Sequence, residues 1–351
     1  MKILVSAFEH SANIHLKALT KEFKGDVEMV GVFDASLGRP IVDLRALAIM
    51  GIVDALKKLP FFLGLSKQML SLVPEVDKIL LIDSSGFNLP LAKKIKKKYP
   101  DKEIIYYILP QAWAWKKKRI PVLARTIDHL ASILPFEPAY YPEGAPIEYV
   151  GHPLLDEILR FKEKRSVGNR IAFMPGSRKS EITRLMPHYI ALQKELGCDA
   201  TLIVPEHFKE NIEELYGDVS SFTIAYDAHK TLYESDFAFI CSGTATLEAV
   251  LIGTPFILSY IAKKVDFFIG TRLLNIDYIG LGNIMFDQFE QRPMHPELWQ
   301  NEVTLANLLR TYRQMDQEKF FEDALRLRSY LKHGSSKRVA QIIEGRDEDQ
   351  I

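Results

Sequence analysis

The chain has few of the features that mark secreted, membrane-spanning or metal-dependent proteins. It contains 2 cysteines in 351 residues, Cys198 and Cys241, and they show no metal-ligand spacing. A disulfide framework or a zinc site is therefore not expected, and the low cysteine content fits a reducing cytoplasm. The longest uncharged apolar stretch, residues 249–262, contains Gly-Thr-Pro and is too short to span a bilayer.

The first residues do not resemble a secretion signal. Met1–Ala7 has strand character and is followed closely by Glu9, so the long apolar region of a signal peptide is missing. We therefore expect a cytoplasmic location.

The charged residues sum to zero but are distributed unevenly along the chain. The formal net charge is zero, yet residues 1–165 carry 25 Lys and Arg against 19 Asp and Glu, and the remainder carries 20 against 26. A basic half joined to an acidic half suggests that one half faces an anionic partner.

Short apolar runs alternate with helix-like segments along most of the chain. This alternation predicts an α/β fold with parallel sheets and helices on both faces. The charged segment 161–169 is taken as a linker, which divides the chain into two Rossmann-like domains, 1–165 and 166–325, whose sheets face each other across a cleft. Residues 326–351 are expected to form a helical tail, and its return to the first domain is left open. The predicted strands are 3–6, 29–33, 79–82, 104–108, 130–133, 149–150, 171–174, 200–204, 222–225, 237–240 and 256–258.

The segment Ser242–Glu248 reads Ser-Gly-Thr-Ala-Thr-Leu-Glu and follows the predicted strand 237–240. Small residues let a ligand approach the backbone closely, and the free N–H groups at a helix start attract phosphate. Glu248, one turn into the helix, can accept hydrogen bonds from a ribose. The segment therefore predicts a nucleotide site, and an ordinary strand–helix turn capped by Ser or Thr is the alternative.

A second loop, Pro175-Gly176-Ser177-Arg178, follows the first strand of the second half. Ser177 is expected to cap the next helix and to place Arg178 in its first turn, where a positive charge is unfavourable unless an anion binds. The guanidinium fork suits a diphosphate, whereas a solvated surface arginine is the alternative. The two loops together predict a nucleotide-diphosphate site without a Walker loop or a GxGxxG pattern.

Further motifs occur along nearly the whole chain: Met50-Gly51, Ile82-Asp83 with Phe87-Asn88, Gln111–Trp115, Leu134–Glu137, Val150–Pro153, Pro175–Arg178, Ser242–Glu248, Gly282–Ile284, Pro296–Leu298 and Gln300. In order and spacing they resemble the lipid-A-disaccharide synthases, inverting glycosyltransferases of the two-domain GT-B architecture. The most specific elements are Trp-Ala-Trp, Leu-Pro-Phe-Glu and Gly-His-Pro. The histidine of the last, His152, either holds the hinge or contacts substrate.

The resemblance implies transfer of 2,3-diacylglucosamine from UDP to 2,3-diacylglucosamine 1-phosphate, which yields a β-1,6-linked disaccharide 1-phosphate and UDP. It implies no cofactor, no metal and no nucleic-acid partner. It also implies a peripheral position on the inner membrane of a Gram-negative bacterium, and a homodimer is left open. The alternatives are another UDP-sugar enzyme such as a 2-epimerase, and a non-catalytic lipid or nucleotide-sugar binding protein.

The resemblance also implies two sets of binding residues. The residues expected to bind the nucleotide are Gly176, Ser177, Arg178, Ser242, Gly243, Thr244, Ala245, Thr246, Glu248 and Asn283. The residues expected to bind the acceptor and its acyl chains are Ser11, Asn13, Met50, Phe61, Phe62, Asn88, Trp113 and Trp115.

The chain departs from the family pattern where the catalytic base is expected. The family's Gly-Glu-Ala-Ser-Gly-Asp is replaced by residues 8–13, and its Asp-x-Pro-Asp-Phe-Asn by residues 83–88. Gly86 stands where the family has its presumed catalytic aspartate and cannot replace it. Glu9 and Asp83 are the nearest candidates for the proton acceptor, followed by His15. For Asp83 the alternative is a structural carboxylate that caps the next helix.

Two aromatic segments have both a functional and a structural interpretation. Trp113 and Trp115, in a predicted loop before Lys116–Arg119, form either a wall for a sugar or acyl group or a buried tryptophan above a solvated basic face. The apolar segment 48–65, which includes Phe61 and Phe62, predicts a membrane-docking, acyl-binding patch. A core-facing helix is the alternative there.

Overall fold

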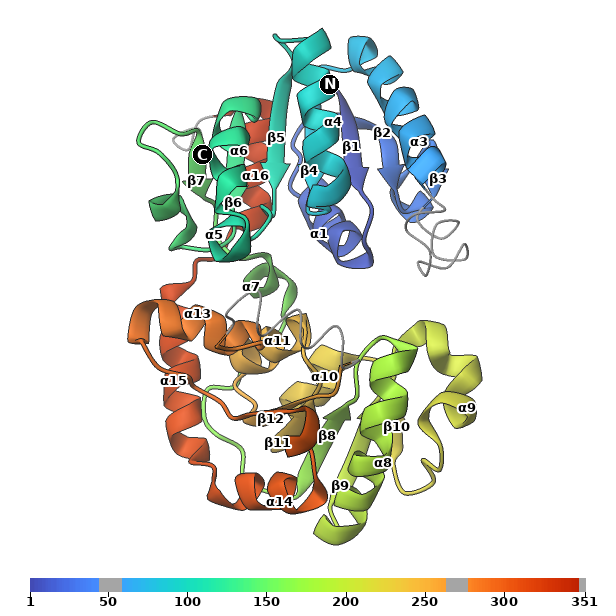
Figure 1. Ribbon diagram of the computed structural model, residues 1–351, viewed down its shortest axis with the longest axis vertical. Coiled ribbons are helices and arrows are strands. Elements are labelled where there is room, and N and C mark those ends of the chain that lie inside the picture. The colour runs from blue at the N-terminus through green and yellow to red at the C-terminus, as the bar shows by residue number, and fades with distance from the viewer. Residues whose placement is uncertain (44–58, 263–276, 347–351) are drawn as a thin grey trace. The chain divides into compact units, whose positions relative to one another are not determined.

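The computed structural model describes residues 1–43, 59–262 and 277–346 (Figure 1). The chain divides into two compact units: unit 1 comprises Met1–Glu157 with Leu331–Ile351, and unit 2 comprises Ile158–Tyr330. Within the described ranges, no helix has the length and apolar character needed to cross a membrane.

Unit 1 is built on a seven-stranded parallel sheet with the order β3-β2-β1-β4-β5-β6-β7. Side chains of neighbouring residues alternate between two apolar cores, so that Ile3 and Val5 lie in one core and Leu4 in the other. Both faces are therefore buried, which explains why these strands read as continuous apolar runs. The strands are β1 (Lys2–Ala7), β2 (Glu28–Phe33), β3 (Val42–Asp43), β4 (Lys78–Ile82), β5 (Glu103–Tyr107), β6 (His129–Ser132) and β7 (Ile147–Tyr149).

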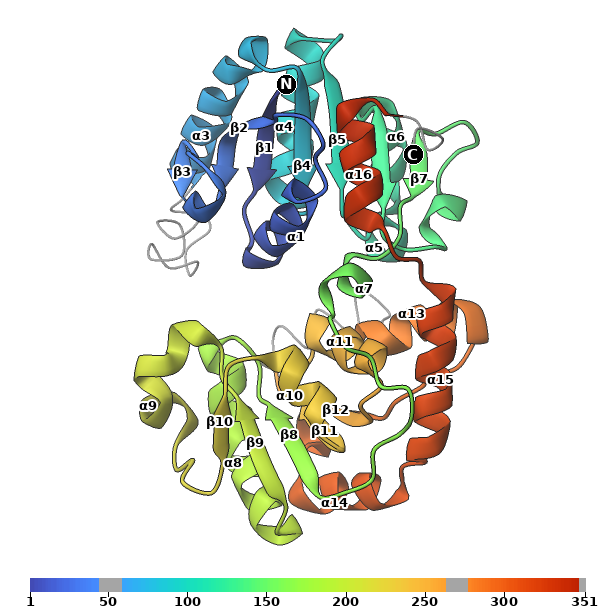
Figure 2. The same ribbon diagram turned by 180° about the vertical axis from the view of Figure 1, so that it is seen from behind.

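Helices cover both faces of this sheet. Figure 1 shows α3, α4 and α6 over one face, and Figure 2 shows the carboxy-terminal helix α16 over the opposite face, where it packs with α1. The α-helices among the described residues of unit 1 are α1 (His10–Thr20), α3 (Leu59–Leu72), α4 (Ser85–Lys98), α5 (Ala112–Trp115), α6 (Ile120–Thr126), α7 (Pro153–Glu157) and α16 (Ser335–Glu344). The tryptophan pair thus lies in a short helix and not in the predicted loop.

Unit 2 repeats the design with a six-stranded sheet of order β10-β9-β8-β11-β12-β13. All of its paired strands are parallel. The strands are β8 (Arg170–Met174), β9 (Asp199–Ile203), β10 (Thr223–Ala225), β11 (Phe237–Ile240), β12 (Phe256–Tyr260) and β13 (Glu297–Trp299). Outside residues 263–276, which the structure does not describe, its α-helices are α8 (Lys179–Leu196), α9 (Ile212–Tyr216), α10 (Ala228–Glu234), α11 (Thr244–Ile252), α13 (Leu281–Glu290), α14 (Leu305–Gln314) and α15 (Gln317–Tyr330).

The chain changes units at positions that differ from the predicted divisions after residues 165 and 325. It enters unit 2 at Ile158, because the following segment packs there: the Lys162 N–H donates to the Ile252 carbonyl at 2.9 Å, and its ammonium group donates to the Ser235 carbonyl. The return at Leu331 places α16 in unit 1. Its Arg338 forms a bidentate ion pair with Glu148 at 2.5 and 2.8 Å.

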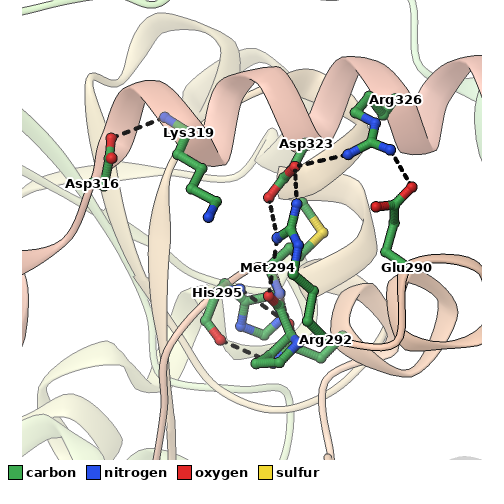
Figure 3. A network of polar contacts seen from close by, with 10 residues as sticks. Glu290, Arg292, Met294, His295, Asp316, Lys319, Asp323 and Arg326 are labelled. Carbon is green, nitrogen blue, oxygen red and sulfur yellow. Dashed lines mark hydrogen bonds and ion pairs between the residues drawn. The ribbon is translucent and has the colours of Figure 1, made fainter.

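An ion-pair network fastens α15 to the end of α13 (Figure 3). The buried carboxylate of Asp323 accepts two hydrogen bonds from Arg292, at 2.6 and 2.7 Å. Arg326 lies 3.8 Å from Asp323 and also pairs with Glu290. The network therefore fixes the segment after α13, which matters for the site described below.

Candidate active site

In both sheets the strand order reverses beside the first strand, between β1 and β4 in unit 1 and between β8 and β11 in unit 2. Ligands of open α/β sheets bind where the loops diverge at this switch point, beyond the carboxyl ends of the strands. The register aligns Ala7 with Ile82 and Met174 with Ile240. The sequence motifs after β1, β4, β8 and β11 therefore lie at the two switch points.

The loop after β8 is shaped by a glycine and a buried carboxylate. Gly176 has φ +109°, and a Cβ there would lie 2.6 Å from Oε2 of Glu181, so only glycine fits. Glu181 is buried and accepts hydrogen bonds from the Arg178 backbone N–H at 3.3 Å and from its Nη1 at 2.8 Å. Arg178 is itself the N-cap of α8. The prediction that Ser177 caps this helix is therefore wrong.

The loop after β11 exposes backbone at the start of α11. Gly243 has φ +140°, and it and Thr244 are exposed, while Ser242 and Ala245 are half-buried. Thr246 is fully buried; its hydroxyl donates to the Gly243 carbonyl at 2.8 Å and accepts from the Leu281 N–H at 3.2 Å. Thr246 thus ties this turn to the start of α13.

Glu248 and Asn283 differ in how far a ligand can reach them. The Glu248 side chain is 16% exposed, and its Oε2 lies 3.4 Å from Nε2 of His229 in α10. Asn283 is fully buried, and its amide donates to the His295 carbonyl and to Glu297 at 2.9 and 2.8 Å. Its Oδ1 accepts the N–H groups of Met294 and His295. Asn283 holds the segment that Figure 3 shows next to Arg292, and its nucleotide contact stays a prediction.

Backbone strain marks the corresponding edge of unit 1. Asp83 and Ser84, directly after β4, have φ of +50° and +43°, and Ile108, directly after β5, has φ of +60°. The left-handed conformation costs roughly 1–2 kcal/mol for each residue that is not glycine. Such residues cluster at functional sites, where the surrounding structure holds them. Ser84, and not Asp83, occupies the N-cap of α4, so the capping role considered for Asp83 is not observed.

Hydrogen bonds from two asparagines hold the strand ends of unit 1. The Asn88 amide donates to the carbonyls of Ile82 and Asp83 at 3.1 and 2.8 Å. The Asn13 amide donates to the carbonyls of Ala7 and Glu9 at 2.9 and 2.8 Å. Both asparagines are buried. Their amides therefore shape the loops, and their contact with the acceptor stays a prediction.

Titratable groups gather beside Asp83. Burial raises its pKa above the ordinary value, against the opposing effects of the Ser84 N–H and the charge of His15. Nδ1 of His15 hydrogen-bonds Glu157 at the end of α7. Burial, helped by the charge of His15, lowers the pKa of His152 to about 3, so this histidine is neutral. Glu9 is the exposed N-cap residue of α1.

An aromatic cluster includes residues from the same chain segments as both candidate carboxylates. The rings of Phe8 and Phe87 have centroids 4.5 Å apart, and Phe62 lies 6.1 and 6.0 Å from them. Phe8 precedes Glu9 directly, and all three rings are half-buried. Phe61 is also half-buried and packs against the core. Ser11 is half-buried, whereas Met50 lies outside the described residues.

A second aromatic cluster surrounds Trp113. The indole is 8% exposed and packs edge-on to Phe136 at 4.9 Å and near Tyr140 at 5.9 Å. In the described part of the chain, its Nε1 meets no hydrogen-bond partner. Glu137, the adjacent buried carboxyl, accepts from the Ser132 hydroxyl at 2.5 Å, and burial raises its pKa to about 7. The side chain of Trp115 lies outside what the structure describes.

Sequence reasoning missed several residues that shape these edges, chiefly Glu181, Glu157, His229 and Tyr106. Glu181 stands at the third position of α8, where a glutamate typical of a helix start was the available signal. The other three depend on contacts between distant segments and had no local signal.

Residues 3–340 match the family described as lipid-A-disaccharide synthetase. The lipid-A-disaccharide synthase of Helicobacter pylori (strain G27) is 48% identical over 352 residues, which cover 96% of both chains. That of Campylobacter jejuni (strain RM1221) is 41% identical over 364 residues, with 97% of this chain and 98% of the relative covered.

A solved structure extends the likeness to the fold. The crystal structure of CalG4, the calicheamicin glycosyltransferase, is similar with a TM-score of 0.62 and 12% identity, over 98% of this chain and 97% of that one. At this identity the likeness shows the fold alone. The predicted GT-B architecture, with one parallel sheet in each unit, is therefore confirmed.

Proposed function

Because this chain belongs to the lipid-A-disaccharide synthetase family and is a glycosyltransferase of lipid A disaccharide synthesis, we propose the substrates and the residues that act on them. The donor is UDP-2,3-diacylglucosamine, and the acceptor is 2,3-diacylglucosamine 1-phosphate. The products are the β-1,6-linked disaccharide 1-phosphate and UDP. Unit 2 binds the nucleotide, and unit 1 binds the acceptor.

The proposal for unit 2 rests on one arrangement: an exposed arginine held by a buried carboxylate at the switch point. The side chain of Arg178 is 77% exposed, yet Glu181 holds its Nη1 and its backbone N–H. Its guanidinium is oriented before a ligand arrives, which suits a diphosphate leaving group. The exposed backbone of Gly243 and Thr244 contacts the phosphates, and Glu248 binds the ribose.

Catalysis is a direct displacement at the anomeric carbon. The 6-hydroxyl of the acceptor attacks, the bond to the UDP oxygen breaks, and configuration inverts. The enzyme must align the reactants, take the hydroxyl proton and stabilise the negative charge on the departing UDP. Arg178 and the Ser242–Thr246 turn supply the last function.

Asp83 is the first candidate for the proton acceptor, and Glu9 is the second. Asp83 lies directly after β4 in the strained turn, and burial raises the pKa of its carboxyl above the ordinary value. A carboxylate with a raised pKa binds a proton more readily, which makes it a better general base. Glu9 is the second candidate because its carboxylate is exposed at the same edge of the sheet.

The acceptor's acyl chains contact the rings of Phe8, Phe62 and Phe87, which lie beside these carboxylates. The enzyme reaches its lipid substrates at the inner membrane through α3, where the Leu63 side chain is 49% exposed and Lys67 is exposed one turn later. The homodimer left open by the resemblance stays a prediction.

The test compares Asp83→Asn and Glu9→Gln with the unaltered enzyme, with diacylated donor and acceptor. The variant that removes the base should lose about 10²–10⁴-fold in kcat/KM, the usual contribution of general base catalysis. A base acts when deprotonated, so wild-type activity falls as the pH falls through its pKa. This acidic limb should disappear in that variant. Wild-type rates and an unchanged pH profile in both variants would exclude both carboxylates.

A further inference from the structure

The carbonyl of Asp83 receives hydrogen bonds from two different elements. The Tyr106 hydroxyl, in the neighbouring strand β5, donates to it at 2.7 Å, and the Asn88 amide, in α4, donates at 2.8 Å. Asn88 is in turn fixed by the Ser6 hydroxyl of β1, which donates to its Oδ1 at 2.5 Å. A left-handed turn is thus held from the strands on both sides of β4 and from the helix that follows.

We propose that Tyr106 is a positioning residue that holds the left-handed Asp83–Ser84 turn and thereby directs the Asp83 carboxylate. The inference rests on the proposed role of Asp83 as the proton acceptor. It explains how the enzyme can catalyse transfer with Gly86 in place of the family aspartate. The held backbone at position 83 orients the Asp83 carboxylate, which then takes the proton. A strained conformation persists only when its surroundings over-determine it, and the two donors to one carbonyl do so.

The chemistry of Tyr106 suits a permanent donor. Its side chain is fully buried. Burial, followed by the negative charge of Asp83, raises the pKa of its hydroxyl far above the ordinary value, so the proton stays on the oxygen at every working pH. Because the carbonyl has two lone pairs, both donors can bind it at once.

The neighbouring residue offers a matched control. Tyr107 is equally buried and belongs to the same strand, but it points into the opposite core, where its hydroxyl lies 2.8 Å from Oγ of Ser335. Replacing either tyrosine by phenylalanine removes one buried hydrogen bond and keeps the ring. Only the first replacement loosens the Asp83 turn.

The experiment measures kcat, KM, the pH profile and the melting temperature of Tyr106→Phe and Tyr107→Phe. We expect Tyr106→Phe to lower kcat by roughly ten- to a hundred-fold with KM for the donor unchanged, because small misplacements of a catalytic group have effects of this size. A looser turn admits water to Asp83, so the acidic limb should move to lower pH. Tyr107→Phe should show neither change, although its melting temperature falls by a similar amount.

Equal kcat and equal pH profiles in the two variants would overturn the inference. If Tyr106→Phe does not fold, Ser6→Ala offers a second test, because it removes the hydrogen bond that fixes Asn88 and so weakens the hold on the Asp83 carbonyl. The acidic limb of this variant should also move to lower pH. An unmoved limb would count against the inference. Asp83→Asn separates the two claims. If that variant keeps full activity, the proposed function of Asp83 fails. If it is inactive while Tyr106→Phe is normal, only the positioning role fails.

Discussion

Nη1 of Arg178 lies 2.8 Å from Oε1 of Glu181, and the backbone N–H of the same arginine donates to Oε2 at 3.3 Å. One buried carboxylate therefore holds both the backbone and the side chain of an exposed arginine. This arrangement accounts for a cation at a helix start, where the helix dipole disfavours it. The carboxylate offsets that field and leaves the remaining guanidinium N–H groups available for a ligand.

We expect Arg178→Ala to lower kcat by about 10²–10³-fold, the usual effect of removing a charged contact to the transition state. The fold should survive because the side chain is 77% exposed. Lys179→Ala, an exposed neighbour at the first position of α8, is the control and should retain activity. Steady-state kinetics and calorimetric titration with UDP measure the effect. Near-normal kcat with intact UDP affinity would refute the role of Arg178.

Gly86→Asp restores the residue type that the family has at this position. The described residues leave open space within 4 Å of a Cβ at Gly86, which is the second residue of α4. An aspartate there should stabilise the protein by about 0.5–1.5 kcal/mol, because it stiffens the helix and complements its dipole. Activity should persist, and the change should recover part of the rate lost in Asp83→Asn. Gly86→Asn is the uncharged control, and equal recovery by both would argue against a second base.

Leu63→Glu should weaken binding to vesicles of anionic phospholipid without a change in melting temperature, because this side chain is 49% exposed. Phe61→Glu should instead destabilise the fold by about 2–4 kcal/mol, since Phe61 packs against the core. Leu325→Glu, at an exposed leucine of unit 2, is the control for surface charge. Sedimentation with vesicles measures binding, and undiminished binding of Leu63→Glu would exclude α3 as the docking surface.

Glu137→Gln should remove a pH dependence of stability. Burial raises the pKa of Glu137 to about 7, so the folded state holds this proton more tightly than the unfolded chain does. The resulting stabilisation is complete below about pH 4.5 and is lost as the pH rises through 7; it amounts to roughly 3 kcal/mol.

The glutamine variant should therefore melt at a higher temperature than the wild type at pH 8 and lose this advantage at pH 5. Glu143→Gln, at an exposed carboxylate, serves as the control. Thermal melts across this pH range provide the measurement. Parallel curves for Glu137→Gln and the wild type would show that Glu137 ionises normally.

The sequence patterns predicted every interior strand and missed two strands at sheet edges, β3 and β13. The interior strands are apolar on both faces, so β1, β4 and β11 stand out as runs of Ile, Leu, Val and Phe. The edge strands β3 and β13 are short, and β13 is half-buried throughout. The other two edge strands, β7 and β10, are also only partly buried, yet the predicted strands 149–150 and 222–225 found them. Edge strands bury little and therefore carry a weak apolar signal, which was sufficient for two of the four.

By itself, the sequence determined the α/β class, the family motifs and the loops that carry them, because apolar periodicity and small-residue turns are local properties of the chain. The tertiary structure decided which side chain serves which loop. Tyr106 and Tyr107 look alike in sequence, yet they face opposite sides of a strand whose neighbour is β4. Only the strand order brings one hydroxyl to the carbonyl of Asp83 and the other to Ser335. Contacts between distant segments depend on packing, and no local pattern encodes them.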